Sequence, residues 1–301
     1  MHCQPVYIII PVHNRRDITL KCLEVLNKSG VLDKYYIVIV DDGSTDGTHA
    51  AIVHEYQHSH PNVIILEGDG NLWWMGAIRW GMNYGYEQGA EFFIWLNDDT
   101  FPIDDAIDQL LAICQDKPKT IAYAQCYATS ECITPTYGAH KFNQLLMNSV
   151  SVSTPSNHIT VADALSGNLV CLPRSVVDDI GLPDPRWIHY GDHAYTWKAK
   201  QNGYKLLTFG SVRAVCIPDN FDSNSHDWLI GDIPLIDHVK SFSSPKSVYH
   251  PPSRWYRCIS TWGGLGIIVF IRPYLQLLRA GILRWLFPRS FLLYLKTKLN
   301  T

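Results

Sequence analysis

The stretch "YYIVIVDDGSTDGT" (residues 35–48) decides the fold. Its first half is an apolar run rich in β-branched residues, which predicts a strand buried on both faces. Its second half is a polar turn rich in Asp and Gly, and a helix-like segment over residues 47–60 follows at once. Strand, polar turn and helix in this order form one unit of a parallel sheet.

The same unit recurs on either side of this stretch. Further strands are expected at 6–12, 62–68 and 90–99, and further helices at 17–30 and 76–89. Repeated βα units predict an α/β fold with a mostly parallel central sheet and helices on both faces. The later half shows a weaker pattern. There we expect a helix at 102–115, a strand followed by a short helix within 164–181, and a helix within 189–204.

A polar cluster ends each predicted strand of the first hundred residues. The four clusters are "PVHN" (11–14), "DDGSTDGT" (41–48), "EGDGN" (67–71) and "NDD" (97–99). Taken singly they are ordinary turn formers, and Ser44 or Asp46 could simply cap the next helix. Four clusters at one sheet edge favour a binding site, because ligands of parallel sheets bind beyond the carboxyl ends of the strands. No P-loop or dinucleotide fingerprint follows the first strand.

The composition is that of a globular protein, with 301 residues of which 47% are hydrophobic. The 8 cysteines form no C-x-x-C pair, which argues against a zinc ribbon or a redox dithiol and favours reduced thiols in a cytosol. The start "MHCQPVYIIIPVHN" lacks a basic segment and a long apolar segment, so we expect no signal peptide. A cytoplasmic location is predicted.

The net charge of -3 is unevenly distributed along the chain. Residues 251–301 contain eight Arg or Lys and no Asp or Glu, which leaves 17 basic and 28 acidic residues in the rest. An acidic body with a basic, apolar tail predicts a catalytic part and a surface that meets anionic lipid. Nucleic acid is not expected as a partner, because the body lacks basic residues interleaved with aromatics.

The tail "TWGGLGIIVFIRPYLQLLRAGILRWLFPRSFLLYLKTKL" (261–299) is apolar but interrupted. Arg272, Arg279 and Arg284 recur too often for a 20-residue spanning helix. We therefore expect a broken pair of amphipathic helices lying in the membrane interface. The alternative is that these segments pack on the catalytic body or on a second subunit of a homo-oligomer.

Four motifs together resemble the inverting family 2 glycosyltransferases, which have the GT-A fold. They are "IIIPVHN" (8–14), "VIVDDGSTDGT" (38–48), "WLNDDT" (95–100) and "YGDHAYTWKAKQNGY" (190–204). In addition, "GNLWWMGAIRWG" (70–81) is similar to the bacterial branch with rhamnosyl and galactofuranosyl transferases. The resemblance implies a catalytic domain over 1–250, with a nucleotide-binding half 1–100 and an acceptor-binding half 101–250, followed by a membrane-associating tail over 251–301.

The resemblance also implies a donor site at the strand ends. A nucleotide sugar has a diphosphate leaving group whose developing charge a divalent cation can offset, and Asp oxygens suit Mg²⁺ or Mn²⁺. In the family the last residue of an Asp-x-Asp triplet holds the metal, which implies Asp99 here. A later His often completes that site, and His226 is the candidate. Asn97 here replaces the first Asp of the triplet. For Trp74, packing in the core is the alternative to a donor contact. The residues that the resemblance implies as donor contacts are Pro11, Asp41, Asp42, Asn71, Trp74, Asn97 and Asp98.

An inverting transfer needs a general base for the acceptor hydroxyl. In the family this base is the Asp of a Glu-Asp pair that begins a helix ending in a Gly-aromatic pair eleven residues on. Asp192 stands at that interval before Gly203 and Tyr204, although Gly191 replaces the Glu. The alternative for Asp192 is a helix N-cap, which stabilises a helix by about 1 kcal/mol.

The expected function is a metal-dependent inverting transfer of a sugar from a nucleoside diphosphate. The leading donor is dTDP-rhamnose, followed by UDP-galactofuranose or another UDP-linked hexose. The expected acceptor is a polyprenyl-diphosphate-linked glycan or a surface polysaccharide such as O-antigen, met at the cytoplasmic face of the inner membrane. Two alternatives stay open: a nucleotidyltransferase that makes nucleotide sugars, and a non-catalytic membrane-bound organiser of polysaccharide assembly.

Overall fold

The computed structural model describes residues 5–143, 148–217, 234–245 and 247–292. The chain divides into two compact units, residues 1–218 and 219–301. The second unit thus begins before residue 251, where the tail was predicted to start.

The first unit contains a nine-stranded sheet in the order β3-β2-β1-β4-β11-β6-β12-β5, with β9 paired to β12. One half is parallel and matches the predicted βα units: β1 (Val6–Val12), β2 (Tyr36–Asp41), β3 (Val63–Glu67) and β4 (Phe92–Leu96). The other half is mixed: β5 (Thr100–Pro102), β6 (Thr120–Tyr127), β9 (Ile159–Val161), β11 (Leu169–Pro173) and β12 (Lys205–Cys216). β11 runs antiparallel to both β4 and β6, and β12 runs parallel to β6. The predicted α/β sheet is confirmed.

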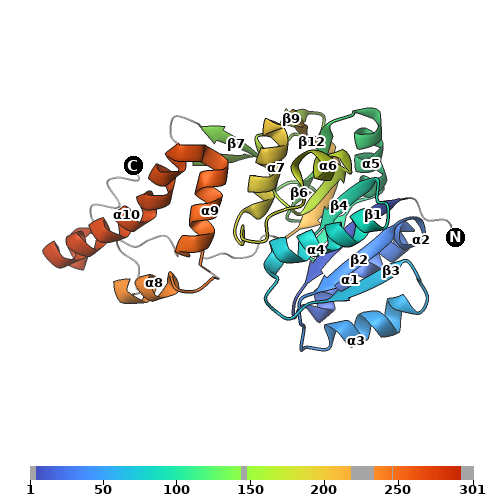
Figure 1. The fold of residues 1–301 in the computed structure, drawn as a ribbon, viewed down its shortest axis with the longest axis horizontal. Coiled ribbons are helices and arrows are strands. Elements are labelled where there is room, and N and C mark those ends of the chain that lie inside the picture. The colour runs from blue at the N-terminus through green and yellow to red at the C-terminus, as the bar shows by residue number, and fades with distance from the viewer. Residues whose placement is uncertain (1–4, 144–147, 218–233, 246, 293–301) are drawn as a thin grey trace. The chain divides into compact units, whose positions relative to one another are not determined.

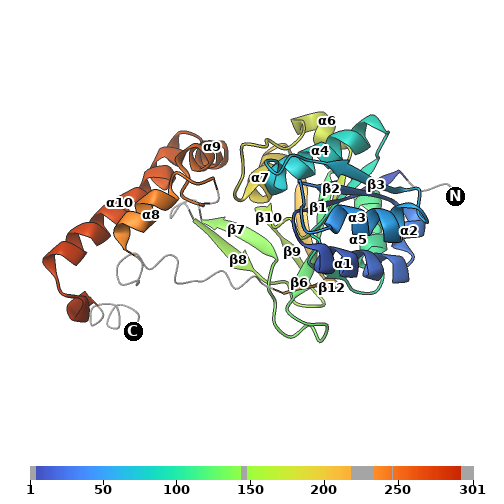
Figure 2. The same ribbon diagram turned by 90° about the horizontal axis from the view of Figure 1, so that it is seen from below.

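Helices cover both faces of this sheet (Figure 2). One face carries α4 (Trp73–Glu87), and the other carries α1 (Arg16–Lys28), α3 (Thr48–Ile52) and α5 (Ala106–Asp116). Glycines allow α4 to lie close to the strands, because a Cβ added at Gly81 would stand 2.5 Å from Ile9 Cγ2. The remaining helices of this unit are α2 (Val31–Lys34), the π-helical turn Val53–Gln57, α6 (Ser175–Ile180) and α7 (Gly191–Gln201).

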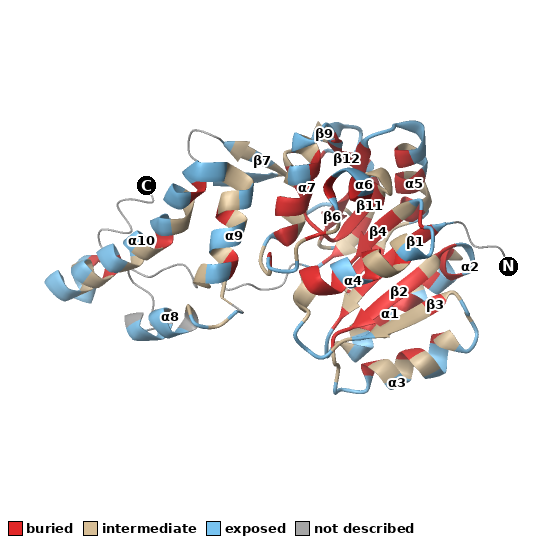
Figure 3. Ribbon diagram, viewed as in Figure 1, coloured by how far each residue is buried: buried red, intermediate tan, exposed pale blue. Residues whose placement is uncertain are grey.

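The core follows the parallel strands, which are buried along most of their length (Figure 3). Trp95 in β4 is fully buried, and its indole Nε1 donates to Met82 Sδ of α4 at 3.2 Å. This contact fixes α4 against the strand whose end carries "NDD". A second, three-stranded sheet has the order β10-β7-β8. Its strands are β7 (Ala139–Asn143), β8 (Asn148–Val152) and β10 (Ala164–Leu165).

The second unit is helical (Figure 1). It contains α8 (Leu235–Ser241), α9 (Pro251–Trp262), a 3₁₀ turn (Gly263–Leu265) and α10 (Gly266–Leu286). Pro273 lies inside α10 and has no N–H to offer the carbonyl of Val269 one turn earlier. Arg254 of α9 compensates, because its guanidinium donates to Val269 O at 2.7 Å and to Phe270 O at 3.2 Å. This ties α9 to α10.

One helical stretch among the described residues, Pro251–Leu286, has the length and composition needed to cross a membrane. Its most apolar window has a mean hydropathy of 1.4 and is 22% buried. The expectation that the arginines of the tail are too frequent for such a span is therefore wrong on composition. The predicted break in the tail is present as the 3₁₀ turn between α9 and α10.

Candidate active site

The polar clusters after β1 and β2 bind each other directly. Asn14 N donates to Ser44 Oγ at 2.8 Å, and Thr45 N donates to Asn14 Oδ1 at 2.7 Å. His13 Nδ1 lies 2.6 Å from the Asp42 carbonyl. The carboxyl ends of neighbouring parallel strands thus form one rim, as the sheet topology requires.

Asp42 anchors the third cluster to this rim. Its carboxylate accepts three backbone N–H groups, from Gly70 at 2.8 Å, Leu72 at 2.9 Å and Trp73 at 3.1 Å. Asp42 is 6% exposed, so both oxygens are used inside the protein. Its predicted contact with a nucleotide base would have to share these oxygens, and its clearest role is to hold the loop that begins α4.

The other predicted donor contacts near β1, β2 and β3 differ in how far they are buried. Asp41 is buried, and its Oδ1 accepts Ser44 N at 3.0 Å. Pro11 lies half-buried in β1, in register with Val40. Asn71 is exposed and its N–H donates to Asp69 Oδ1 at 3.0 Å. Asn71 is thus the predicted contact most open to solvent.

Trp74 joins the third cluster to the fourth. Its indole Nε1 donates to Asn97 Oδ1 at 2.7 Å, and its ring meets that of Trp95 edge-on at 5.6 Å between centroids. Gly167 lies directly against the same indole, because a Cβ added there would stand 2.3 Å from two of its ring carbons. The structure therefore gives Trp74 a packing role and uses Asn97 as its hydrogen-bond acceptor.

Asp98 and Asp99 follow β4 and share one arginine. Arg15 NH1 stands 3.3 Å from Asp98 Oδ1, and Arg15 NH2 donates to Asp99 Oδ2 at 2.9 Å. Thr19 Oγ1 donates to the other oxygen of Asp98 at 3.0 Å. Burial raises the pKa of Asp98 to about 6, against the opposing effect of Arg15. The Asp98 side chain is 4% exposed and that of Asp99 14%, so Asp99 is the more accessible of the two.

The donor set fits a divalent cation that is shared with phosphate. Among the described residues no group of three or more His, Cys, Asp or Glu side chains could hold a metal by itself. Two carboxylates at a strand end are nevertheless what Mg²⁺ or Mn²⁺ uses when the substrate supplies phosphate oxygens. His226, the predicted further ligand, lies outside the described residues.

Asp192 lies in the first turn of α7. Its Oδ2 accepts Gly167 N at 2.7 Å and its Oδ1 accepts His193 N at 2.8 Å. Burial raises its pKa above the ordinary value, although both N–H groups oppose the shift. Gly191 stands where the Glu was expected, and a Cβ added there would stand 2.4 Å from Met75 Cε and 3.1 Å from Trp187 Cβ, so a larger residue would have to displace the Met75 side chain.

His140 of β7 is a neighbour of Asp192 that the sequence did not indicate. Its ring lies 4.0 Å from that of His193, and its Nε2 stands 3.2 Å from Ser166 Oγ. Burial lowers its pKa to about 3, with a further contribution from His193. His140 is therefore neutral at ordinary pH. No local motif marks it, because β7 reaches the site through pairing with β10.

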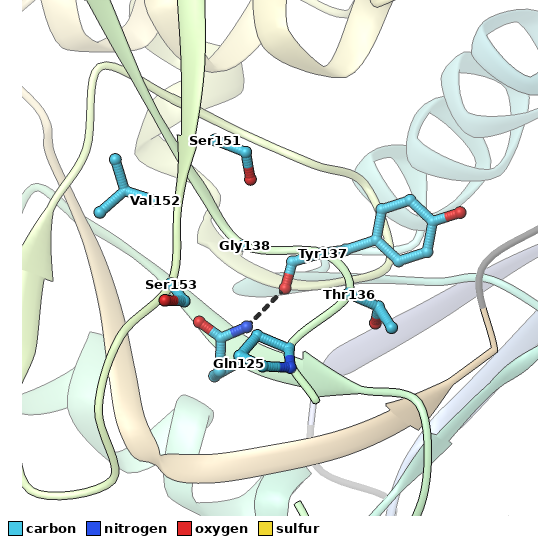
Figure 4. Close-up of a pocket in the computed structure, with 8 residues that line it drawn as sticks. Gln125, Thr136, Tyr137, Gly138, Ser151, Val152 and Ser153 are labelled. Atoms are coloured by element: carbon cyan, nitrogen blue, oxygen red, sulfur yellow. Dashed lines mark hydrogen bonds between the residues drawn. The ribbon is translucent and has the colours of Figure 1, made fainter. Parts of the chain in front are cut away.

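A cavity of about 290 Å³ lies between the end of β6 and the β7–β8 sheet (Figure 4). The amide of Gln125 on its floor is occupied, because Nε2 donates to Tyr137 O at 2.7 Å and Oε1 accepts Thr154 N at 2.7 Å. Thr136 on its wall donates to Cys216 O at 2.9 Å, and Cys216 Sγ lies 3.9 Å from Asp99 Oδ1. Cys216 thus connects Thr136 on the cavity wall to Asp99 of the acidic pair.

Contacts connect Asp42, the end of β4 and Asp192. Asp42 holds the loop before Trp74, Trp74 contacts Asn97 and Gly167, and Gly167 N binds Asp192. Asn97 precedes Asp98 and Asp99 in the chain, so the buried carboxylate of Asp192 belongs to the same network as the end of β4.

The comparisons with known proteins agree on a family. The model described as "Glycosyl transferase family 2" matches residues 7–167. The poly(ribitol-phosphate) beta-glucosyltransferase of Bacillus spizizenii is 36% identical over 75 residues, which are 25% of this chain and 12% of that protein. Glycosyltransferase AglE of Haloferax volcanii is 26% identical over 217 residues, 71% of this chain and 66% of that protein. The chain thus spans less than two thirds of both relatives.

Two solved structures share the architecture. The crystal structure of GalNAc-T7 with UDP, GalNAc and Mn²⁺ has a TM-score of 0.55 at 16% identity, over 70% of this chain and 43% of that one. The mannosyltransferase PcManGT from Pyrobaculum calidifontis, in complex with GDP-Man and Mn²⁺, has a TM-score of 0.55 at 17% identity, over 99% of this chain and 81% of that one. These likenesses show that the fold is GT-A.

Proposed function

The chain belongs to the glycosyl transferase family 2, and from this premise we propose that it transfers a sugar, with inversion, from a nucleoside-diphosphate donor to a glycan acceptor. The observation that carries the proposal is the chain of contacts between the end of β4 and Asp192: Trp74 donates to Asn97, two residues before Asp99, and packs on Gly167, whose N–H binds Asp192. Such an arrangement can hold the leaving group on one side and remove the acceptor proton on the other.

The residues that follow β4 are proposed to stabilise the leaving group. Asp99, with Asp98 behind it, would hold Mg²⁺ or Mn²⁺, and the bound cation would offset the charge that develops on the departing diphosphate. Both structural neighbours contain Mn²⁺ together with a nucleotide or nucleotide sugar, which supports this assignment. Asp98 is held by Arg15 and Thr19, and Arg15 also binds Asp99, so Asp98 acts on Asp99 through this shared arginine.

The acceptor proton is the task of Asp192. Two backbone N–H groups hold both carboxylate oxygens, which fixes the direction of the oxygen that would take the proton. Burial raises the pKa of this carboxyl, and a raised pKa makes a carboxylate a stronger base. The cavity beside Thr136 and Ser151 offers hydroxyl groups to an acceptor sugar next to this rim.

The donor is proposed as a class, with dTDP-rhamnose as the first compound to test and UDP-linked hexoses next. The acceptor is proposed to be linked to a polyprenyl diphosphate, and α10 supports a membrane location. Its exposed apolar side chains recur at helical spacing and form one stripe, made of Ile267, Ile271, Leu275, Leu278, Ile282 and Trp285. A stripe of this kind flanked by arginines suits the headgroup region of the cytoplasmic face of the inner membrane.

The test is transfer from a panel of nucleotide sugars by the wild-type chain and by Asp192→Asn. The variant should lose at least about a hundredfold in turnover, as expected for removal of a general base, while the affinity for the nucleoside diphosphate stays within about twofold. Asp116→Asn is a matched control, because this carboxylate is 75% exposed and pairs with its neighbour Lys117. Turnover of Asp192→Asn close to that of the control would refute the assignment of the base. Release of pyrophosphate in place of nucleoside diphosphate would indicate a nucleotidyltransferase.

A further inference from the structure

Arg15 spans the two carboxylates to which the proposed function assigns the cation. One guanidinium nitrogen faces Asp98 at 3.3 Å and the other donates to Asp99 at 2.9 Å, so a single fork bridges the pair. Arg15 is the N-cap residue of α1, and Thr19 one turn later also binds Asp98. The first turn of α1 is thus built onto the acidic end of β4.

The two carboxylates are not equally committed to this contact. Both oxygens of Asp98 have partners, and its side chain is 4% exposed. Asp99 has one oxygen on Arg15, while its other oxygen meets only the weak donor Cys216 Sγ at 3.9 Å among the contacts described. The Arg15 side chain is 39% exposed, whereas that of Asp98 is nearly closed to solvent. Asp99 is therefore the carboxylate that an incoming cation can take from Arg15.

The charges at the acidic pair determine how the Arg15 guanidinium and a divalent metal ion compete for Asp99. Two carboxylates and one guanidinium leave one net negative charge in the free protein. A divalent cation placed on Asp99 would stand within a few ångströms of the guanidinium and be repelled by it. A metal bound to a diphosphate brings anionic oxygens as well, and a planar guanidinium pairs well with those.

We propose that Arg15 is the resident counter-cation of the acidic pair: it holds Asp99 in the free protein, yields that carboxylate to the divalent cation, and then pairs with the diphosphate of the donor. This proposal rests on the proposed function. It makes Arg15 oppose the bare metal and favour the metal–nucleotide complex, so that metal and donor bind together.

The test measures binding of Mn²⁺ by electron paramagnetic resonance, with and without a nucleoside diphosphate, in Arg15→Gln. Without nucleotide the variant should bind Mn²⁺ roughly tenfold more tightly than the wild type, because the repelling charge is gone. With saturating Mn²⁺ it should bind UDP or dTDP roughly tenfold more weakly. Arg16→Gln is the matched control, since it removes the same charge one residue away and Arg16 makes its described hydrogen bond to Asp46 through the backbone.

Mn²⁺ affinity of folded Arg15→Gln equal to or weaker than that of the control, in the absence of nucleotide, would overturn the proposal. If Arg15→Gln does not fold, Arg15→Lys carries the test. A lysine keeps the repelling charge but cannot bridge both carboxylates. Asp99 should therefore be released in part, and Mn²⁺ should bind more tightly than in the wild type but by less than about tenfold; unchanged or weaker Mn²⁺ binding would again overturn the proposal. Failure of the proposed function is distinguishable, because it would show as absence of sugar transfer by the wild type while the Mn²⁺ titration without nucleotide still gives its result.

Discussion

Gly167 gives the sharpest test of how the rim is built. Its Cα faces the Trp74 indole, and an added methyl group would stand 2.3 Å from two ring carbons, whereas ordinary carbon contacts are at about 3.5–4.0 Å. Gly167→Ala must therefore displace the indole or the backbone by more than an ångström. Displacing the indole breaks its hydrogen bond to Asn97, and displacing the backbone breaks the bond to Asp192.

The magnitude follows from these two effects. Overpacking costs about 1–3 kcal/mol, and one lost buried hydrogen bond adds about 1 kcal/mol, so the free energy of unfolding should fall by about 2–4 kcal/mol. Turnover should fall as well, because either displacement moves the proposed donor and base sides apart. Urea denaturation measures the first effect and donor-dependent transfer the second.

Two further variants make the test specific. Gly264→Ala is a matched control, because nothing lies within 4 Å of a Cβ added there, and it should change the free energy of unfolding by less than about 0.5 kcal/mol. In a Trp74→Leu background, which removes the ring carbons that the added methyl group would meet, Gly167→Ala should cost less stability than it does in the wild type. The reasoning is refuted if Gly167→Ala alone unfolds within about 0.5 kcal/mol of the wild type.

Three more predictions concern protons and the Asp42 anchor. The pKa of His140 is about 3 in the folded protein and 6.5 ordinarily, so the unfolded chain takes up the proton at a higher pH than the folded protein does. The contribution of His140 to the free energy of unfolding is therefore complete above pH 6.5 and falls as the pH drops toward 3, with a loss of about 2 kcal/mol at pH 5. Urea titrations at pH 7.5 and 5 should show this loss in the wild type and not in His140→Gln; an equal loss in both contradicts it. The raised pKa of Asp192 predicts that turnover falls with decreasing pH at a midpoint above the ordinary carboxyl value of 3.8; a pH–rate profile with its midpoint at or below that value would count against Asp192 as the base. Asp42→Ala leaves three backbone N–H groups without their acceptor and should lower the free energy of unfolding by about 3 kcal/mol. Asp42→Asn should lower the free energy of unfolding by less. An unchanged free energy of unfolding in Asp42→Ala would show that the loop before Trp74 does not need this anchor.

The parallel half of the sheet was predictable because its signals are local. Each strand from β1 to β4 is an apolar run closed by a polar turn, and each predicted range contains the strand observed there. Helix α7 likewise begins at Gly191, where the sequence places its start. The predicted strand ranges 62–68 and 90–99 extend one to three residues beyond β3 and β4 at their ends. The predicted helix over residues 47–60 is present as α3 and a π-helical turn, which end at Gln57. β7 (AHKFN) and β9 (ITV) lack the long apolar run that marks β1 to β4, and their pairing with distant strands leaves no local signal.

The sequence predicted that the site residues lie at the strand ends, but it did not predict what each side chain contacts there. Asp42 is committed to a loop thirty residues away, and Trp74 is packed on Gly167; neither partner can be inferred from spacing. Gly191, in place of a Glu before Asp192, packs against Met75 of α4, a contact between residues more than a hundred positions apart. Arg15 and His140 enter for the same reason, through tertiary contacts that leave no local motif.

The account depends most on the cation that the acidic pair would share with the donor. The direct measurement is donor-dependent sugar transfer by the wild-type chain, first in excess EDTA and then after Mn²⁺ or Mg²⁺ is added back. The account predicts that transfer stops in EDTA, returns with either cation, and does not return in Asp99→Asn. Undiminished transfer in EDTA, or full metal-restored transfer by Asp99→Asn, would contradict it.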